Sequence, residues 1–229
     1  MQIDLLVLEL LASKLCHDLV SPVSAINNGV ELIEDIGGSV VDEAMKLIGD
    51  SAQHASRRLR LYRMAYGRAG SEDNLGIKDV RQLAEQYLAG GKSTITWPEN
   101  QPPEIFGTHK GTLKVMLNLI VLAEELLPYG GNIALGPAHE DGCMFTITGR
   151  SAQLTPPLHA ALENVTPVEE LTPRSVQAYI TGRFAAHFGV KLTPTQHGVD
   201  RLEMIVTLIP GAAASVPTPA APPAAESAA

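Results

Sequence analysis

Two long amphipathic segments at the start of this 229-residue chain constrain its fold more than any other feature. In the first segment, apolar residues recur every three or four positions, as they do on the buried face of a helix. These residues are Leu8, Leu11, Leu15, Leu19, Ile26, Val30 and Ile33. The break at Gly37-Gly38-Ser39 separates this segment from the next one, so the sequence predicts a helical hairpin.

The second segment carries a heptad seam, in which apolar positions are separated alternately by four and three residues. The seam consists of Val41, Met45, Ile48, Ala52, Ala55, Leu59, Tyr62 and Tyr66. Two helices alone cannot bury two such faces, whereas a second copy of the chain would complete a four-helix bundle. We therefore expect a homodimer. The alternative is that both faces pack against the rest of the same chain.

The remainder of the chain mixes helical and strand-like patterns. Helical periodicity covers residues 77–89 and 110–127, and a further helix is expected over 172–188, with Thr172 as its N-cap and Pro173 as its first residue. Short alternating runs that are typical of strands lie at 93–97, 132–135, 143–148 and 201–208. This mixture predicts an α+β domain built as a two-layer α/β sandwich.

Changes in composition suggest where the domains end. We expect the helical hairpin over residues 1–68, a polar linker over 69–75 and the α/β domain over 76–210. The last stretch, 211–229, is rich in Ala and Pro and carries almost no charge, so we expect a disordered tail.

Charge and hydropathy exclude several classes of function. The formal net charge is −8, and no basic run exceeds Arg57-Arg58-Leu59-Arg60, so a nucleic-acid partner is not expected. No stretch reaches the roughly 18 consecutive apolar residues of a membrane span. Glu9 interrupts the first apolar run, which argues against a signal peptide. A cytoplasmic protein without a membrane partner is therefore expected.

The cysteines and histidines do not have the spacing of metal ligands. Cys16 and Cys143 lie far apart, so we expect two reduced thiols and no metal site. His54 and the basic band of Arg57, Arg58, Arg60 and Arg63 on the second helix are predicted to face solvent.

One histidine stands apart from the others because of its helical phase. At about 100° per residue, His17 lies nearly opposite the apolar stripe, and Ser21, Ser24 and Asn28 fall in a narrow arc beside His17. An exposed imidazole of this kind can accept a charged group and pass it on. The alternative is an ordinary surface histidine on a structural helix.

The motif around this histidine points to a known family. The segment His17-Asp18-Leu19-Val20-Ser21-Pro22, followed by a second heptad helix, resembles the dimerisation and histidine-phosphotransfer domain of two-component sensor kinases. The resemblance implies that His17 is the phosphorylated residue and Asp18 its polarising partner. Pro22 lacks the N–H that would bond the carbonyl of Asp18, so a bend in the helix is expected.

The later part of the chain resembles the Bergerat-type (GHKL-like) ATP-binding domain of those kinases, with its nucleotide residues replaced. Asn118 matches the first asparagine of the family's asparagine box, but the second, which holds Mg²⁺, aligns with Leu122. Gly149-Arg150-Ser151-Ala152 lacks the acidic residue that recognises adenine, and the segment 175–182 has a single late glycine. The resemblance therefore implies a degenerate domain that does not bind ATP.

Together these features resemble the ChpT-type histidine phosphotransferases of alphaproteobacterial phosphorelays, over residues 1 to about 210. Such an enzyme takes a phosphoryl group from the receiver-domain aspartate of a hybrid histidine kinase and passes it to response-regulator receivers, in control of the cell cycle. The receiver would supply Mg²⁺, so no cofactor of the chain's own is expected. The residues expected to contact receivers are Val20, Ser21, Pro22, Ser24, Ala25 and Asn28.

Two other functions remain as alternatives at this point. An active, ATP-dependent sensor histidine kinase would need the nucleotide residues that are replaced here. A non-catalytic scaffold would retain the heptad seam but would have no use for His17.

Overall fold

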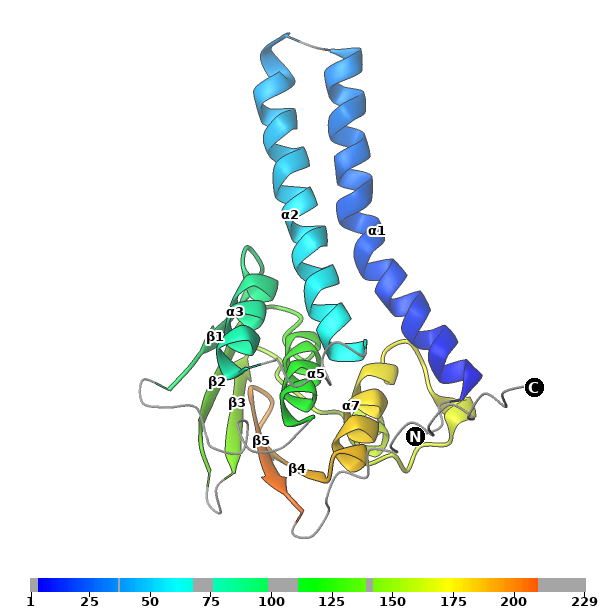
Figure 1. Ribbon diagram of the computed structural model, residues 1–229, viewed down its shortest axis with the longest axis vertical. Coiled ribbons are helices and arrows are strands. Elements are labelled where there is room, and N and C mark those ends of the chain that lie inside the picture. Colours follow the sequence, from blue (N-terminus) through cyan, green and yellow to red (C-terminus); the bar gives the residue numbers. More distant parts are fainter. Residues whose placement is uncertain (1–3, 37, 68–75, 99–110, 139–141, 210–229) are drawn as a thin grey trace, which may run out of the picture.

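The N-terminal residues form the expected hairpin of two long helices. The computed structural model describes residues 4–36, 38–67, 76–98, 111–138 and 142–209. Helix α1 (Leu5–Asp35) and helix α2 (Val41–Tyr66) are joined through the 3-10 turn η1 (Gly38–Val40) and extend away from the rest of the molecule (Figure 1). The break predicted at residues 37–39 is therefore confirmed.

Local sequence explains how α1 begins and how closely it approaches α2. Asp4 is the N-cap, and its Oδ1 accepts a 2.8 Å hydrogen bond from the N–H of Leu6. Gly29 is buried against α2: a Cβ there would lie 2.6 Å from Cγ1 of Ile48. A side chain at this position would push the helices apart, so Gly29 sets their spacing.

Helix α1 continues through Pro22, which is buried. The N-terminal half of α1 leans away from α2, whereas its C-terminal half runs beside it (Figure 1). A proline inside a helix removes one backbone hydrogen bond and bends the helix, which fits the expected effect of Pro22.

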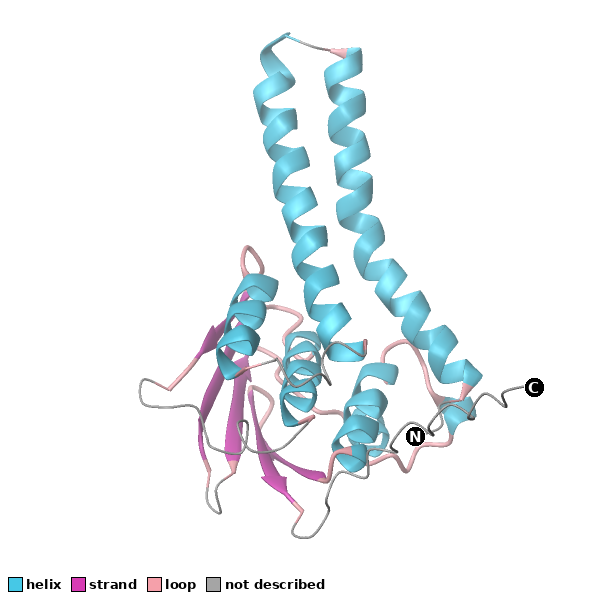
Figure 2. Ribbon diagram, viewed as in Figure 1, coloured by secondary structure: helices cyan, strands magenta, loops and turns pink. Residues whose placement is uncertain are grey.

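The second half of the chain contains a five-stranded mixed sheet. Its strands are β1 (Ser93–Thr96), β2 (Gly131–Pro137), β3 (Cys143–Gly149), β4 (Val190–His197) and β5 (Arg201–Leu208). The strand order is β1-β2-β3-β5-β4; β1 and β2 are parallel, and the other neighbours are antiparallel. The strands are magenta in Figure 2. Four strands match expected runs. Strand β4, which was not expected, lies at the edge, where Pro194 is tolerated.

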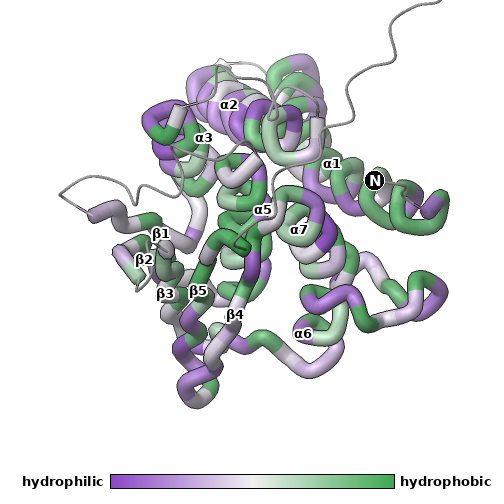
Figure 3. Tube along the Cα trace, turned by 60° about the horizontal axis from the view of Figure 1, so that its bottom comes forward, coloured by the Kyte–Doolittle hydropathy of each residue, from purple (hydrophilic) through white to green (hydrophobic). Residues whose placement is uncertain are grey.

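One layer of helices packs between the sheet and the hairpin. This layer contains α3 (Ile77–Leu88), α5 (Thr112–Glu125) and α7 (Val176–His187), with the short elements α6 (Pro156–Leu162) and η3 (Val168–Glu170) beside them. Helix α5 is buried along almost its whole length and forms the centre of the apolar core (Figure 3). The α+β class, with N-terminal helices and a two-layer α/β domain, is confirmed.

Helix α7 begins later than the sequence predicted, because residues 172–175 form a turn of their own. Thr172 Oγ1 accepts a hydrogen bond from the N–H of Ser175, and Ser175 Oγ accepts one from the N–H of Thr172. Ser175, and not Thr172, is therefore the N-cap. The late glycine, Gly182, lies against α6, where a Cβ would overlap the carbonyl oxygen of Leu162. This glycine allows two helices to pack closely.

The heptad seam divides between two faces of α2. Ile48, Ala55 and Tyr62, spaced seven residues apart, are half-buried or buried. Met45 and Leu59, on the other half of the seam, remain 57% and 52% exposed. On α1, Leu8 and Val30 are also exposed, so part of each apolar face is left uncovered within the single chain.

Several expectations fall outside what the structure describes or tests. The linker (69–75) and the tail (211–229) lie outside the described residues, and the domain bounds remain predictions.

None of the described helices has the length and hydropathy of a membrane span. Cys16 is exposed, Cys143 is buried, and both are free thiols, as expected.

Candidate active site

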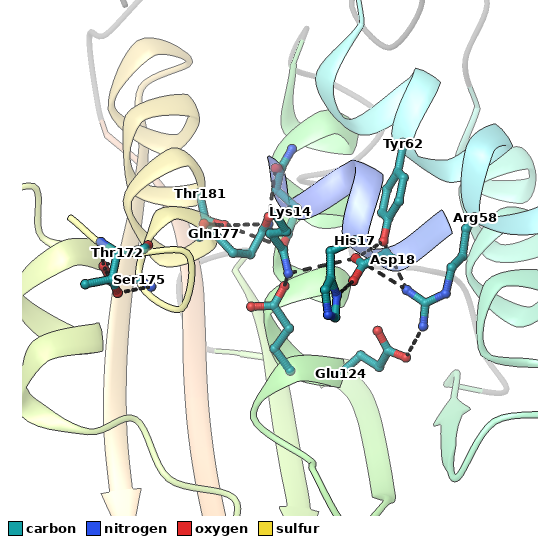
Figure 4. Close-up of polar contacts among 12 residues, drawn as sticks. Lys14, His17, Asp18, Arg58, Tyr62, Glu124, Thr172, Ser175, Gln177 and Thr181 are labelled. Carbon is teal, nitrogen blue, oxygen red and sulfur yellow. Dashed lines mark hydrogen bonds and ion pairs between the residues drawn. The ribbon is translucent and has the colours of Figure 1, made fainter. Parts of the chain in front are cut away.

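His17 projects from α1 into solvent. Its side chain is 90% exposed, and its Nδ1 lies 3.6 Å from Oδ1 of Asp18 (Figure 4). Ser21, Ser24 and Asn28 are exposed on the same helix. The helical phase thus gave the correct orientation for the imidazole, which is open to attack a group presented by another molecule.

Asp18 points back toward the protein and is held there by three side chains. The Tyr62 hydroxyl donates a 2.6 Å hydrogen bond to Oδ2 of Asp18. The same oxygen lies 3.8 Å from Nη1 of Arg58 and 3.9 Å from Nζ of Lys14. Burial and the bond to Asp18 raise the pKa of Tyr62 far above its usual range, so its hydroxyl keeps its proton and acts as a donor.

Arg58 is the largest departure from the sequence predictions. The basic band was expected to face solvent, but the Arg58 side chain is only 16% exposed. Its guanidinium donates to the hydroxyls of Tyr62 (3.0 Å) and Tyr87 (3.2 Å), and pairs with Oε1 of Glu124 at 3.1 Å. His54, also expected to face solvent, is half-buried and accepts a 3.2 Å bond from Nε of Arg58.

The base of the hairpin is fastened to the α/β domain by polar contacts. The Asn118 side chain of α5 donates to the carbonyl of Ala65 at 2.9 Å, and Nζ of Lys114 donates to the carbonyl of Gly67 at 2.6 Å. Tyr66 donates to Oε1 of Gln177 on α7 at 2.7 Å. The carbonyls at a helix C-terminus lack partners within the helix, and a cation there is favourable. The end of α2 is therefore held firmly on α5 and α7.

These contacts occupy the one asparagine-box residue that the sequence retains. Asn118 is fully buried, and its backbone carbonyl accepts a 3.1 Å bond from Nε2 of Gln177. Leu122 is buried in the apolar core. Among the residues that the structure describes, no group of three or more His, Cys, Asp or Glu side chains could hold a metal ion.

A second carboxylate lies next to the site. Oε1 of Glu125, at the end of α5, is 2.6 Å from Nζ of Lys14, which in turn lies near Asp18. Burial raises the pKa of Glu125 to about 7, although Lys14 opposes the shift.

Glu125 is expected to make folding stability depend on pH near neutrality. Its pKa is higher in the folded chain than its ordinary value of 4.5, so between about pH 4.5 and 7 the native state binds more protons than the unfolded state. Stability from this group is fully present below that window and is lost as pH rises through it. We expect Glu125→Gln to reduce this loss in the free energy of unfolding by on the order of 2 kcal/mol. The measurement is urea unfolding at pH 5, 6, 7 and 8.

Glu31→Gln, a change at an exposed position of α1, is the matched control and should leave the wild-type pH dependence intact. If Glu125→Gln and Glu31→Gln have the same profile as the wild type, Glu125 does not titrate in this window.

His17 and Asp18 were predicted from the sequence, but the side chains around them were not. Lys14 and Asp18 are four residues apart on one helix, as are Arg58 and Tyr62, and this spacing was the available signal. Tyr87 and Glu124 come from the α/β domain, and nothing in the sequence pattern connects them to His17.

The chain is similar to known proteins over most of its length. Residues 77–199 match the family model described as histidine phosphotransferase C-terminal domain. Protein phosphotransferase ChpT of Brucella abortus (strain 2308) is 34% identical over 188 residues, which cover 80% of this chain and 87% of that protein.

Two further matches extend the comparison. A solved structure of a bacterial phosphotransferase covers 90% of this chain and 98% of its own, with a TM-score of 0.72 and 29% identity. The sensory histidine kinase/phosphatase NtrB of Azospirillum brasilense is 25% identical over 160 residues, which are 67% of this chain but only 40% of NtrB. The chain therefore belongs to the histidine phosphotransferase family, and within it is of the ChpT type.

Proposed function

We propose that this protein is a phosphotransferase of a multistep phosphorelay. It takes a phosphoryl group from the receiver-domain aspartate of a hybrid histidine kinase onto His17 and passes it to the receivers of response regulators. The observation that carries this proposal is the side chain of His17, which is 90% exposed and lies beside an anchored Asp18 on the hairpin. The membership of the family supports the same reaction type.

The chemistry requires little from this chain beyond a positioned nucleophile. The P–O bond of the receiver's aspartyl phosphate breaks, a P–N bond to the imidazole forms, and the receiver regains its carboxylate. Neutral imidazole is the nucleophilic form. Nδ1 of His17 is the nitrogen near Asp18, so we assign the attack to Nε2 on the other side of the ring.

The residues beside His17 provide the surface that a receiver would approach. Val20 is 60% exposed, and Ser21, Ser24 and Asn28 are exposed around it, with the half-buried Ala25 between them. Pro22 is buried, so its contribution to this surface is the shape of the helix. The receiver brings the Mg²⁺ that neutralises the phosphoryl oxygens, and this chain needs neither ATP nor a metal of its own.

The assembly and cellular role belong to the same proposal. The exposed apolar face of the hairpin supports a homodimer that closes a four-helix bundle. The resemblance to ChpT-type proteins supports a cytoplasmic role in cell-cycle control.

One experiment separates this function from a kinase and from a scaffold. The purified protein is incubated with radiolabelled ATP alone, and in parallel with the phosphorylated receiver domain of a hybrid kinase from the same organism. We expect label to arrive from the receiver only. Label arriving from ATP alone would identify an active kinase, and no uptake from any receiver would leave the scaffold function.

A further inference from the structure

One carboxylate of the α/β domain reaches the phospho-acceptor site through Arg58. Glu124, in the last turn of α5, binds two groups at once. Its Oε1 pairs with Nη2 of Arg58 at 3.1 Å, and its Oε2 accepts a 2.6 Å hydrogen bond from the Tyr87 hydroxyl. The guanidinium of Arg58 also lies 5.1 Å from the centre of the Tyr87 ring. Glu124 and Tyr87 together fix the position of Arg58.

Arg58 in turn acts on the partner of His17. Its Nη1 lies 3.8 Å from Oδ2 of Asp18, too far for a direct hydrogen bond, and it donates to the oxygen of Tyr62, which donates to Asp18. Asp18 is therefore held by the hydroxyl of Tyr62, and the guanidinium of Arg58 is bound to that hydroxyl and not to Asp18 itself. This leaves Oδ1 of Asp18 facing Nδ1 of His17.

We propose that Glu124 is a positioning residue for phosphoryl transfer, which holds Arg58 away from Asp18 and so keeps the Asp18 carboxylate available to orient the imidazole of His17. This proposal rests on the proposed function of His17. Without the charge of Glu124, Arg58 loses the carboxylate that competes with Asp18 for its guanidinium. Arg58 then closes on Asp18 as a direct ion pair and draws that carboxylate away from the ring.

The consequence is that the degenerate domain takes part in the reaction site. In this arrangement, α5 contributes a carboxylate to the surroundings of His17 and uses Asn118 to hold α2 in place. Residues of one domain thereby set the geometry of a nucleophile carried by the other.

The test is the Glu124→Gln variant, which keeps the shape of the side chain and removes its charge. Nitrogen-15 NMR of the imidazole reports which nitrogen of His17 carries the proton. We expect the wild type to be protonated mainly at Nδ1 and Glu124→Gln to shift toward an even mixture of the two tautomers. Glu85→Gln removes another arginine–carboxylate pair of the α/β domain, with Arg81 on α3, and should have no effect.

Reactivity is measured with phosphoramidate, a small donor that needs no receiver. The P–N bond of phosphoramidate, whose nitrogen is already protonated, breaks as the P–N bond to the imidazole forms, and ammonia leaves. We expect Glu124→Gln to react about 10-fold more slowly than the wild type, because misplacement of a reacting group reduces the rate steeply. In an Arg58→Ala background, Glu124→Gln should cause no further loss, because Glu124 acts through Arg58.

The outcomes separate the two proposals. A Glu124→Gln protein with the wild-type tautomer and rate would overturn the positioning role. Rate losses of Glu124→Gln and Arg58→Ala that simply add in the double variant would overturn it as well. If the wild type takes no phosphoryl group on His17 from either phosphoramidate or a receiver, the proposed function fails, while the NMR measurement still decides whether Glu124 orients the ring. Thermal unfolding of each variant shows whether the fold is retained.

Discussion

His17→Ala is expected to abolish uptake of a phosphoryl group from a phosphorylated receiver while leaving the fold intact. The imidazole is the proposed nucleophile, and alanine has no atom that can form the P–N bond. The side chain is 90% exposed, and its Nδ1 lies 3.6 Å from Oδ1 of Asp18. Substitutions at such surface positions usually change stability by less than about 0.5 kcal/mol. Transfer is measured by label incorporation, and stability by urea unfolding.

His159→Ala provides the matched control for this prediction. His159 is also an exposed histidine on a helix, with its side chain 45% exposed near Glu163, and it lies on α6. We expect this variant to take up label at the wild-type rate. Persistent labelling of His17→Ala would place the phosphoryl group on another residue and contradict the site assignment.

Met45→Glu combined with Leu59→Glu is expected to convert a dimer into a monomer. These side chains lie two heptads apart on one face of α2 and are 57% and 52% exposed in the single chain. In a four-helix bundle this face would be buried against a second copy. Two carboxylates placed there would have to be desolvated without partners, which costs several kcal/mol.

Light scattering coupled to size-exclusion chromatography gives the mass directly. We expect twice the chain mass for the wild type and the single chain mass for the double variant. Val199→Glu, at a similarly exposed position (60%) outside the hairpin, makes the same kind of change and should remain a dimer. A monomeric wild type, or a double variant that still dimerises, would exclude this face as the interface.

Local patterns in the sequence were sufficient for most secondary structure. The break before α2, the centre of α5 and four of the five strands follow from spacing and from glycines, because these signals act over a few residues. Strand β4 was missed because, at the sheet edge, Pro194 and several polar residues obscure its alternation. The start of α7 was misplaced because Thr172 and Ser175 bond to each other in a preceding turn.

The surroundings of His17 also combine features that the sequence predicted with features that it did not predict. Helical phase alone placed the imidazole in solvent, next to Asp18, since both residues belong to one regular helix. The clustering of arginines on the second helix predicted that Arg58 faces solvent, and this prediction is wrong. Tyr87 and Glu124 lie 29 and 66 residues from Arg58 in the chain, and no local pattern connects residues that are so far apart in sequence.

The sequence by itself thus determined the hairpin, the α+β class, the exposed histidine and the family resemblance, because periodicity and motifs are local properties of a chain. Only the tertiary structure decided what surrounds Asp18. The end of α2 is fixed to α5 by Asn118 and Lys114, and this docking brings Glu124 to Arg58. A buried or half-buried charge requires a partner, and which residue can meet that requirement depends on how distant segments pack.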